Sequence, residues 1–459
     1  MAFLIGGANS AADTGYEVAN SCRFNDGDTA NLYKTQASTT STKKFTISFW
    51  VKRCGGFGSA QVIIGIFEDT SNYGYIRFTT SNELQLRDFY GEGPDLLYTT
   101  NMQFSDPSAW YNCVVAVDSD RTSNDRARIF VNGSQVSCSA TTDTGGTLGF
   151  QSSTVSNKLK IGAIDNSEDG IEHYFDGYLA EFFYLDGQFL AASSFGEFNS
   201  DSPTIWQPID ASGLTFGDAG FYLDFEDSSN LGNDANGGTD FTATNLAAID
   251  QTADTPTNNW CTYNPLYKDA NRNTPTVADG NLDLLATTGS TTNSAGTHAF
   301  STGKWYYEIK WLSGSGDNVT KVGWGNLDQT STPNTASIVY RNSDGNKYID
   351  NTGSSYGDTW VSANDIISTA IDLDSGTKTV QFWKNGSDQG SITISGKLDD
   401  GGLVVPYMEI ANQDRIQLNF GNPLAANSSD AADDNGYGAF EYAPPSGFLA
   451  LNSKNLGGA

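Results

Sequence analysis

Few residues of this chain have the types and spacing that catalysis needs. The two histidines, His173 and His298, lie in no recognisable nucleophile or metalloprotease motif, and a surface position or a satisfied buried position explains each of them. A glycosidase needs two carboxylates at a set separation, and the nearest pair, Glu409 with Asp414, has the wrong spacing. The sequence therefore predicts a protein without enzymatic activity.

One acidic segment has the alternate-oxygen spacing of a calcium loop. Gly170 stands at its sixth place, and oxygen-bearing side chains stand at the first, third, fifth and twelfth: Asp165, Ser167, Asp169 and Asp176. Calcium prefers about six to eight hard oxygen ligands, and alternation lets one turn supply several. However, the twelfth residue is Asp instead of Glu, and the flanking residues are typical of strands. Two interpretations stay open: calcium as the one cofactor, or a solvated turn and no cofactor.

Two loops combine aromatic rings with polar side chains, as sugar-binding loops do. Aromatic faces pack against the apolar patches of a sugar ring, and polar side chains bind its hydroxyl groups. The first loop, residues 89–95, offers Tyr90 and Asp95 as ligand-binding residues. The second loop, residues 340–360, offers Tyr340, Arg341, Asn342, Tyr348, Asp350 and Tyr356. The alternative is that these aromatics fill the core or a subunit interface, and for Trp360 we expect the core.

Composition excludes several classes of partner. The 459 residues carry 25 Lys and Arg against 54 Asp and Glu, a net charge of −29, so a phosphate backbone or an anionic membrane surface would repel the chain. No segment approaches the roughly 20 apolar residues of a membrane span, and the first residues do not resemble a signal peptide. The five cysteines suggest neither a disulfide framework nor a zinc site. We expect no nucleic-acid partner, no membrane insertion and folding in a reducing cytoplasm.

Two hairpins of one design organise the chain. From Trp110 to Val136, apolar residues alternate along two strands that a polar turn joins, and Asn132-Gly133 ends the second strand with a primed-turn signal. The same order recurs from Ile366 to Gly390 and ends on Asn385-Gly386. We expect the first hairpin to keep one face in solvent. The repetition predicts two domains of related β architecture.

Alternation of inward and outward residues continues through both halves, with almost no helical periodicity. The strongest strand of the second half is Lys304-Trp-Tyr-Tyr-Glu-Ile-Lys-Trp311, with Trp305, Tyr307, Ile309 and Trp311 on one face. We predict an all-β fold of two tandem antiparallel jelly-roll-like β-sandwiches. The predicted parts are an N-terminal arm (1–20), a first sandwich (21–227), a linker (228–258), a second sandwich (259–451) and a C-terminal tail (452–459).

The first half resembles the concanavalin A-like, laminin-G-type jelly rolls. The segments that carry the resemblance are Phe45-Thr-Ile-Ser-Phe-Trp-Val-Lys52, Ile129-Phe-Val-Asn-Gly133 and Tyr174-Phe-Asp-Gly-Tyr-Leu-Ala-Glu-Phe182. The second half resembles a SPRY-type sandwich in Gly303-Lys-Trp-Tyr-Tyr-Glu-Ile309, Lys321-Val-Gly-Trp-Gly325 and Gln381-Phe-Trp-Lys-Asn-Gly386. Both folds are common binding scaffolds, so the fold alone names no ligand.

Two further segments, residues 254–265 and 442–451, look like those of two-domain proteins of marine tailed bacteriophages. That resemblance implies a virion structural protein, a tail fibre, spike or head fibre, which folds in the host cytoplasm and adheres to a glycan or protein receptor on the host surface. Its partners would be other virion proteins and further copies of itself, in a homo-oligomer such as a trimer. The alternatives are a capsid decoration or connecting protein without a receptor role, and a polysaccharide depolymerase.

Overall fold

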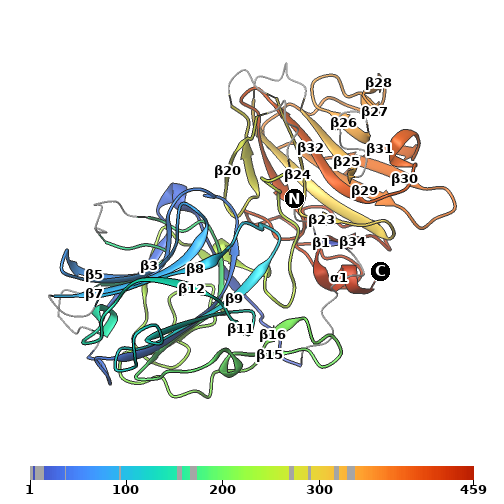
Figure 1. Ribbon diagram of the computed structural model, residues 1–459. Helices are drawn as coiled ribbons and strands as arrows, with labels where there is room; N and C mark the ends of the chain where they lie inside the picture. Colours follow the sequence, from blue (N-terminus) through green and yellow to red (C-terminus); the bar gives the residue numbers. More distant parts are fainter. Residues whose placement is uncertain are drawn as a thin grey trace. The chain divides into compact units, whose positions relative to one another are not determined.

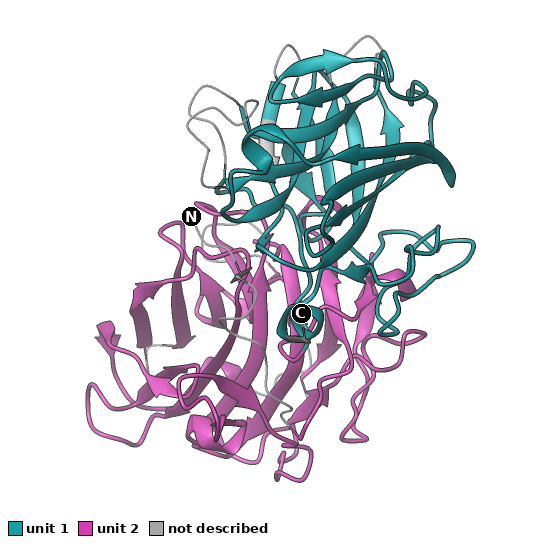
Figure 2. Cartoon of the chain, turned by 90° about the vertical axis from the view of Figure 1, so that its right-hand side faces the viewer, with its two compact units in different colours: residues 1–11, 258–459 teal, residues 12–257 magenta. Residues whose placement is uncertain are grey.

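The structure is a computed structural model that describes residues 4–5, 15–36, 38–91, 95–151, 158–165, 173–267, 273–287, 291–314, 320–327 and 336–458. Antiparallel strands make up nearly all of its regular structure (Figure 1), which confirms the predicted all-β class. The chain divides into two compact units: unit 2 spans residues 12–257, and unit 1 spans residues 258–459 together with residues 1–11 (Figure 2). Among the described residues, no helix has the length and apolar character that a membrane crossing needs.

Two large sheets form unit 2 and enclose one apolar core. In spatial order, sheet A holds β11 (Ser134–Gln135), β10 (Ala127–Val131), β9 (Trp110–Asp118), β4 (Lys44–Arg53), β14 (Gly177–Asp186), β2 (Ser21–Phe24) and β19 (Gln251–Thr252), and β17 (Phe221–Leu223) also pairs with β14. Sheet B holds β12 (Cys138–Asp143), β8 (Asp95–Gln103), β7 (Glu83–Tyr90), β6 (Asn72–Phe78), β5 (Gln61–Asp69), β13 (Lys158–Ile161), β3 (Asn31–Thr35) and β18 (Thr242–Thr244). A small hairpin of β15 (Gly196–Phe198) and β16 (Trp206–Pro208) completes the described strands.

The predicted hairpin of unit 2 is formed by β9 and β10, which pair in antiparallel register with Val131 opposite Cys113. Its second turn has φ values of 45° at Asn132 and 79° at Gly133, the left-handed values that a primed turn needs. The expected solvent face exists on β10 alone. All nine residues of β9 are buried, because a second apolar cluster that includes Phe183 and Phe195 covers the outer side of sheet A.

The stretch that the sequence predicts to be a linker instead closes unit 2. Residues 242–244 pair with β3 and residues 251–252 pair with β2, so each sheet gains an edge strand from this stretch. Asp254 lies fully buried, and its carboxylate accepts hydrogen bonds from Lys52 Nζ at 2.7 Å and from Trp110 Nε1 at 3.0 Å. The polar composition suggested a crossover because much of this stretch binds the sheets through hydrogen bonds, and only a few of its residues, such as Leu231 and Phe241, enter the core.

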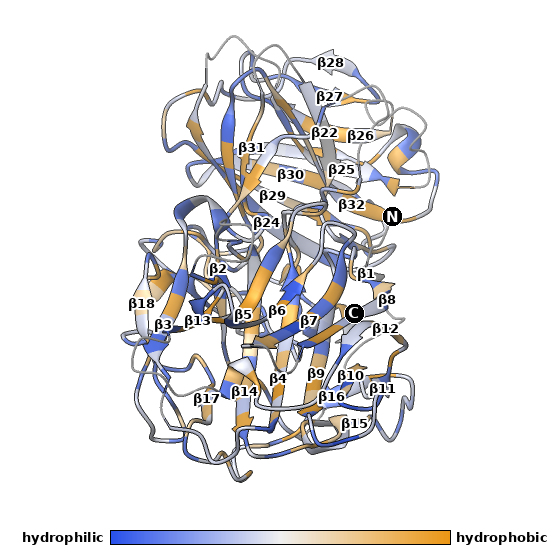
Figure 3. Cartoon of the chain, turned by 60° about the vertical axis from the view of Figure 1, so that its left-hand side comes forward, coloured by the Kyte–Doolittle hydropathy of each residue, from blue (hydrophilic) through white to orange (hydrophobic). Residues whose placement is uncertain are grey.

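Unit 1 is a second sandwich, with its own core built around four fully buried tryptophans, Trp305, Trp311, Trp324 and Trp360. Sheet C holds β20 (Thr276–Ala278), β21 (Asp283–Leu285), β33 (Arg415–Asn419), β24 (Lys304–Ser313), β29 (Ile366–Asp372), β30 (Thr379–Lys384) and β31 (Ser387–Thr393), and β34 (Leu449–Ala450) pairs with β24. Sheet D holds β22 (Thr291–Ala295), β32 (Val404–Ala411), β25 (Lys321–Asn326), β26 (Ser337–Arg341), β27 (Lys347–Ile349) and β28 (Thr352–Ser354). Hydrophobic and hydrophilic residues alternate along several strands of both units (Figure 3).

Strand β24 behaves as its alternation predicts. Trp305, Tyr307, Ile309 and Trp311 all enter the core of unit 1. The opposite face of the strand carries Tyr306 and Glu308, and residues near the C-terminus cover both.

Both predicted chain ends belong to the folded units. The segment 452–459, predicted to be a tail, contains the short helix α1 (Ser453–Gly458), whose Leu456 joins the core of unit 1. Asn455 anchors it, because its Nδ2 donates to Asp433 Oδ2 at 2.7 Å and to the Ala450 carbonyl at 2.8 Å. In the predicted arm, β1 (Leu4–Ile5) pairs in parallel with β23 (His298–Ala299) of unit 1, and Val18 packs into a buried cluster of unit 2.

Removing one partner of the buried pair between Lys52 and Asp254 should destabilise the protein strongly. Asp254→Ala leaves an ammonium group in an apolar cluster without its counter-charge, which costs about 3–5 kcal/mol of unfolding free energy. The double variant K52M/D254L should recover most of the loss, because no charge stays buried. Urea unfolding of the full chain measures both effects. A loss below about 1 kcal/mol in Asp254→Ala would show that this pair does not hold the closing segment.

Glu181 makes the stability of unit 2 depend on pH. It is buried at a register break of β14 with a φ of 48°, and it accepts hydrogen bonds from Tyr16 Oη at 3.0 Å and Tyr222 Oη at 2.9 Å. Burial raises the pKa of its carboxyl from 4.5 to about 7. The folded state therefore keeps a proton that the unfolded state releases, so stability is lost as the pH rises through the window from 4.5 to about 7.

Glu181→Gln should remove the part of this dependence that Glu181 contributes, since the amide does not titrate. Asp88, whose pKa burial also raises to about 7, keeps its own part in both proteins. We expect the variant to melt several degrees above the wild type at about pH 8 and close to it at about pH 4.5. Glu197→Gln, at an exposed carboxylate of the same unit that is not among the charges acting on Glu181, is the matched control and should show no such divergence. Parallel curves for Glu181→Gln and the wild type would contradict the assignment.

Candidate ligand-binding site

A polar hollow of about 620 Å³ opens beside the turn between β6 and β7 in unit 2. Three parts of the chain line it: the loop before β5, the hairpin of β6 and β7, and the residue before Tyr174. The lining residues are Gly58, Ser59, Ala60, Arg77, Thr79, Thr80, Ser81, Glu83, Gln85 and His173. Side chains with hydroxyl, amide and charged groups predominate, so the hollow is suited to a polar ligand.

Arg77 is the charged centre of this hollow, and its orientation follows from strand alternation. Its neighbours Ile76 and Phe78 enter the core, so Arg77 lies on the outer face of sheet B opposite Gln85 in the register. Its Nε donates to Gln85 Oε1 at 2.9 Å, and its guanidinium carbon lies 4.4 Å from the centroid of the Tyr75 ring. These two contacts fix the guanidinium plane. Among the described residues, Arg77 takes part in no ion pair, which leaves its charge for a ligand.

Arg53 fixes the turn that bounds the hollow through a hydrogen bond to Asn82. Its Nη1 donates to Asn82 Oδ1 at 3.0 Å, and the Gly58 amide donates to the same oxygen at 3.2 Å, so one side chain joins the turn to the loop before β5. Asn82 adopts a φ of 64°, a left-handed conformation that asparagine tolerates. Burial lowers the pKa of Arg53 to about 10, which leaves it charged at neutral pH.

The arrangement suits binding of an acidic, hydroxyl-rich ligand. A guanidinium group binds a carboxylate through two parallel hydrogen bonds. The hydroxyl groups of Ser59, Thr80 and Ser81 can donate to or accept from sugar hydroxyls. Among the described lining residues Glu83 is the one carboxylate, and its Oε2 already accepts from Thr79 Oγ1 at 3.1 Å.

The first predicted ligand loop is engaged within the protein. Asp95 forms an ion pair with Arg87 Nη1 and accepts a hydrogen bond from Thr142 Oγ1 at 2.8 Å. Tyr90 is half-buried at the end of β7. The residues between them, 92–94, lie outside the described residues, so a ligand role for this loop stays a prediction.

The second predicted loop is divided between two places in unit 1. Tyr340 and Tyr356 face the core, with ring centroids 5.4 Å apart, and the expected burial of Trp360 is observed. Asn342 is also fully buried. A ligand therefore has no access to Tyr340 or Asn342. Alternation along β26 turns Tyr340 inward, and the residues of the loop itself cover Asn342.

The rest of this loop lies on the outer face of sheet D. The Arg341 guanidinium lies 4.9 Å from the Tyr348 ring centroid and pairs with Asp344, and Lys321 lies 4.9 Å from the same ring. Asp350 Oδ2 instead accepts the Lys397 amide at 2.9 Å. The predicted residues thus do not form one constellation, although Arg341 and Tyr348 do form a half-buried pair.

The same loop contains a serine with the spacing of a hydrolase nucleophile, Gly353-Ser-Ser355-Tyr-Gly357. A nucleophile elbow requires a sharp turn between a strand and a helix. Here the serine follows the edge strand β28 and is exposed, and the next element along the chain is the strand β29 instead of a helix. The spacing alone therefore gives no reason to assign a nucleophile.

Half of the predicted calcium loop can be described. Asp165 forms an ion pair with Lys160, and Asp176 is buried next to Gly55. Ser167 and Asp169 lie outside the described residues. Elsewhere in the described chain, no group of three or more His, Cys, Asp or Glu side chains could hold a metal ion. Calcium binding stays a prediction.

Sequence reasoning missed Arg77, Gln85 and Arg53. The available signal was a basic residue on the outward side of an alternating strand, Tyr75-Ile-Arg-Phe78, in a chain with a net charge of −29. Its pairing with Gln85 could be read from the hairpin register. The contact of Arg53 with Asn82 joins residues 29 positions apart and could not be read from the sequence.

Comparison with known proteins supports two domains of different families. Residues 25–191 match the model of the concanavalin A-like lectin/glucanases superfamily, and residues 304–423 match the SPRY domain model. The first range lies in unit 2 and the second in unit 1. This confirms the predicted order of a concanavalin A-like, laminin-G-type domain followed by a SPRY domain. A search of curated protein sequences found no match.

Three solved structures are similar to this chain at low identity and low TM-score. The SPRY domain of human HERC1 is 15% identical, covers 34% of this chain and 96% of its own, and has a TM-score of 0.28. A heptameric SAP-like pentraxin from Limulus polyphemus is 11% identical over 38% of this chain and 80% of its own, with a TM-score of 0.29. Domains LG4-5 of the mouse laminin alpha1 chain are 10% identical over 91% of each chain, with a TM-score of 0.31. At these identities and TM-scores, the similarities establish nothing further about this chain.

Proposed function

We propose, from a concanavalin A-like domain followed by a SPRY domain and from the hollow at Arg77, that this protein is an adhesin that binds an acidic glycan on a host cell surface. It acts as a fibre or spike on the particle of a tailed bacteriophage, together with further copies of itself. The match of residues 25–191 to a superfamily of lectins and glucanases supports sugar recognition. The resemblance of residues 254–265 and 442–451 to phage proteins supports the place on a particle.

The observation that carries the proposal is the pre-oriented guanidinium of Arg77. A basic group that faces a hollow without a carboxylate partner is unusual in a chain with 54 acidic residues, since most of its basic residues that are half-buried or buried have such a partner. Gln85 and Tyr75 already hold its plane, so little side-chain entropy is lost when a ligand carboxylate docks.

Binding without hydrolysis is the activity that the hollow supports. Glycoside hydrolysis needs two carboxyl groups about 5–10 Å apart across the scissile bond. Glu83 is the one carboxylate among the described lining residues. We therefore assign Arg77 to the sugar carboxylate, and Glu83 with Ser81 and Thr80 to the hydroxyl groups.

Arg77→Met should weaken binding of an acidic glycan about 10- to 100-fold, because it removes a charged hydrogen-bonding group and keeps the aliphatic stem over Tyr75. Calorimetry with an oligosaccharide of uronic acids, and with its carboxyl-reduced form, measures the effect. Arg121→Met, at a guanidinium of the same unit outside the hollow, is the matched control and should bind as the wild type does. Equal affinity of the wild type for the acidic and the reduced sugar would refute the assignment.

The place on a particle has a separate test. Purified phage particles should contain the full chain, and antibody against unit 2 should label their surface in electron micrographs. Recovery of the chain only from the soluble fraction of lysed host cells would refute this part of the proposal. Release of reducing ends from host polysaccharide by the purified chain would refute the non-enzymatic assignment.

A further inference from the structure

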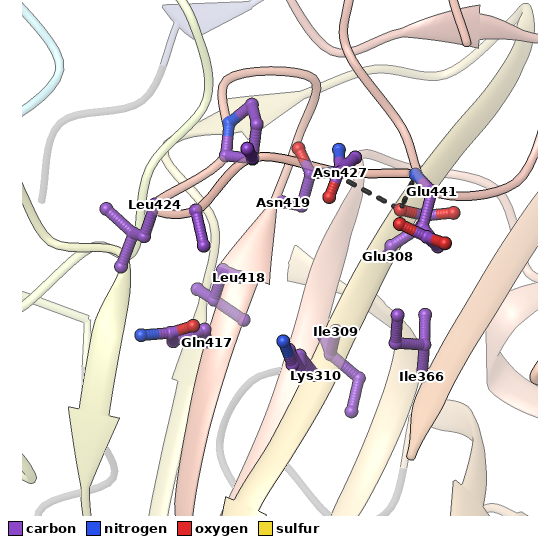
Figure 4. A pocket seen from close by; sticks show the side chains of 13 residues that line it. Glu308, Ile309, Lys310, Ile366, Gln417, Leu418, Asn419, Leu424, Asn427 and Glu441 are labelled. Atoms are coloured by element: carbon purple, nitrogen blue, oxygen red, sulfur yellow. Dashed lines mark hydrogen bonds between the residues drawn. The ribbon is translucent and has the colours of Figure 1, made fainter. Parts of the chain in front are cut away.

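A small pocket in unit 1 lies between the outer face of sheet C and the loop that follows β33 (Figure 4). Its volume is about 60 Å³. Polar groups line one part of it: Lys310 from β24, Gln417 from β33, and Asn427 and Glu441 from the covering segment. Apolar side chains line the rest, namely Ile366, Pro423 and Leu424.

Part of the polar lining is already saturated by the protein. Glu308 accepts hydrogen bonds from the amides of Glu441 at 2.9 Å and Tyr442 at 2.8 Å. Asn419 donates to Glu308 and to the Ala439 carbonyl, and it accepts the Gly421 amide. These contacts build the pocket wall and leave the Glu308 carboxylate and the Asn419 amide nitrogen without capacity for a ligand.

The other polar groups keep capacity that faces the pocket. Gln417 donates through Nε2 to Asp283 at 2.9 Å, which leaves its Oε1 to accept. Asn427 donates through Nδ2 to the Ala439 carbonyl at 2.7 Å, which leaves its Oδ1 to accept. Lys310 takes part in none of the ion pairs found among the described residues of unit 1, so its ammonium group is left to donate.

We infer that this pocket binds the acetamido group of an N-acetylated amino sugar, as a second glycan site separate from the hollow at Arg77. A water needs roughly 10–15 Å³ of such space, so the pocket admits about four or five non-hydrogen atoms and excludes a sugar ring. An acetamido group has four. Its carbonyl oxygen accepts from Lys310, its N–H donates to Asn427 or Gln417, and its methyl group packs against Leu424 and Ile366.

The rim of the pocket favours a sugar over a peptide as the source of the acetamido group. Glu441 accepts two hydrogen bonds from Ser428 and keeps further lone pairs for ring hydroxyls. Those hydrogen bonds, with the nearby charge of Lys310, hold the pKa of Glu441 below its usual value, so it stays an acceptor. Pro423 offers an apolar face at the same rim to the sugar ring.

The test uses the full chain with tri-N-acetylchitotriose, glucosamine trimer and a matched glucose trimer. Saturation-transfer NMR should place the strongest contact on the acetyl methyl protons. Calorimetry should show binding of the N-acetylated trimer at least tenfold tighter than that of the other two. Lys310→Met removes the hydrogen-bond donor, and Ala425→Trp fills the pocket from an exposed position. Each variant should weaken binding of the N-acetylated trimer at least tenfold. Lys378→Met, at an exposed lysine of the same unit outside the pocket, should bind like the wild type.

Three results would overturn the inference: no saturable binding of the N-acetylated trimer, binding that neither pocket variant changes, or tighter binding of an N-acetyl-lysine peptide than of the sugar. Unchanged melting temperatures establish that the variants fold. Arg77→Met separates this site from the first one, since it should leave binding of the N-acetylated trimer intact. If the protein binds the N-acetylated trimer but not the acidic glycan, the assignment of the hollow at Arg77 fails. If it binds the acidic glycan but not the N-acetylated trimer, the assignment of this pocket fails.

Discussion

In each unit, one buried carboxylate ties the segment that closes the sandwich to the outer face of a sheet. In unit 2, Asp254 accepts from Lys52 and Trp110 of adjacent strands. In unit 1, Glu308 accepts from five groups: Tyr306 Oη, Ser368 Oγ, Asn419 Nδ2 and the amides of Glu441 and Tyr442. A buried carboxylate is costly unless its oxygens are paired, so each one specifies where the closing segment must lie. The covering layers, and the core tryptophans behind β24, depend on this constraint.

The candidate pocket of unit 1 arises where that cover ends, and the hollow of unit 2 lies on the outer face of sheet B. The central strands of sheet A are buried on both faces, and β24 is covered over Tyr306 and Glu308. Farther along β24, a pocket separates the sheet from the covering segment, and Lys310 and Leu424 are among the residues that line it. On sheet B, outward residues of β6 and β7 border the hollow at Arg77. The polar residues that alternation turns outward become ligand groups only at such margins, because elsewhere another part of the chain covers them.

Periodicity was sufficient to predict the fold but not the sites. The two Asn-Gly turns and the core face of β24 are local features, since backbone conformation and alternation determine them within a few residues. The burial of Tyr340 and Asn342, and the closing role of residues 228–258, depend on which distant segment covers a face. Arg77 is a second example of what the sequence alone could not predict. Its outward direction follows from alternation, but its lack of a carboxylate partner is a property of the folded arrangement, in which nearby acids such as Asp88 turn inward to bind backbone amides.

If this acidic protein binds an acidic sugar, as proposed, the site has to overcome the repulsion from the protein's own net charge. At physiological salt the Debye length is about 8 Å, so the net charge of −29 repels a ligand only over short distances. Within that range the partly desolvated guanidinium of Arg77 acts at higher effective strength than exposed carboxylates do, because its field is less screened. Such a site discriminates well and binds weakly. Under the proposed function, repetition of the chain on one particle would supply avidity, and a second pocket of different chemistry on the same chain would make attachment depend on two sugars instead of one.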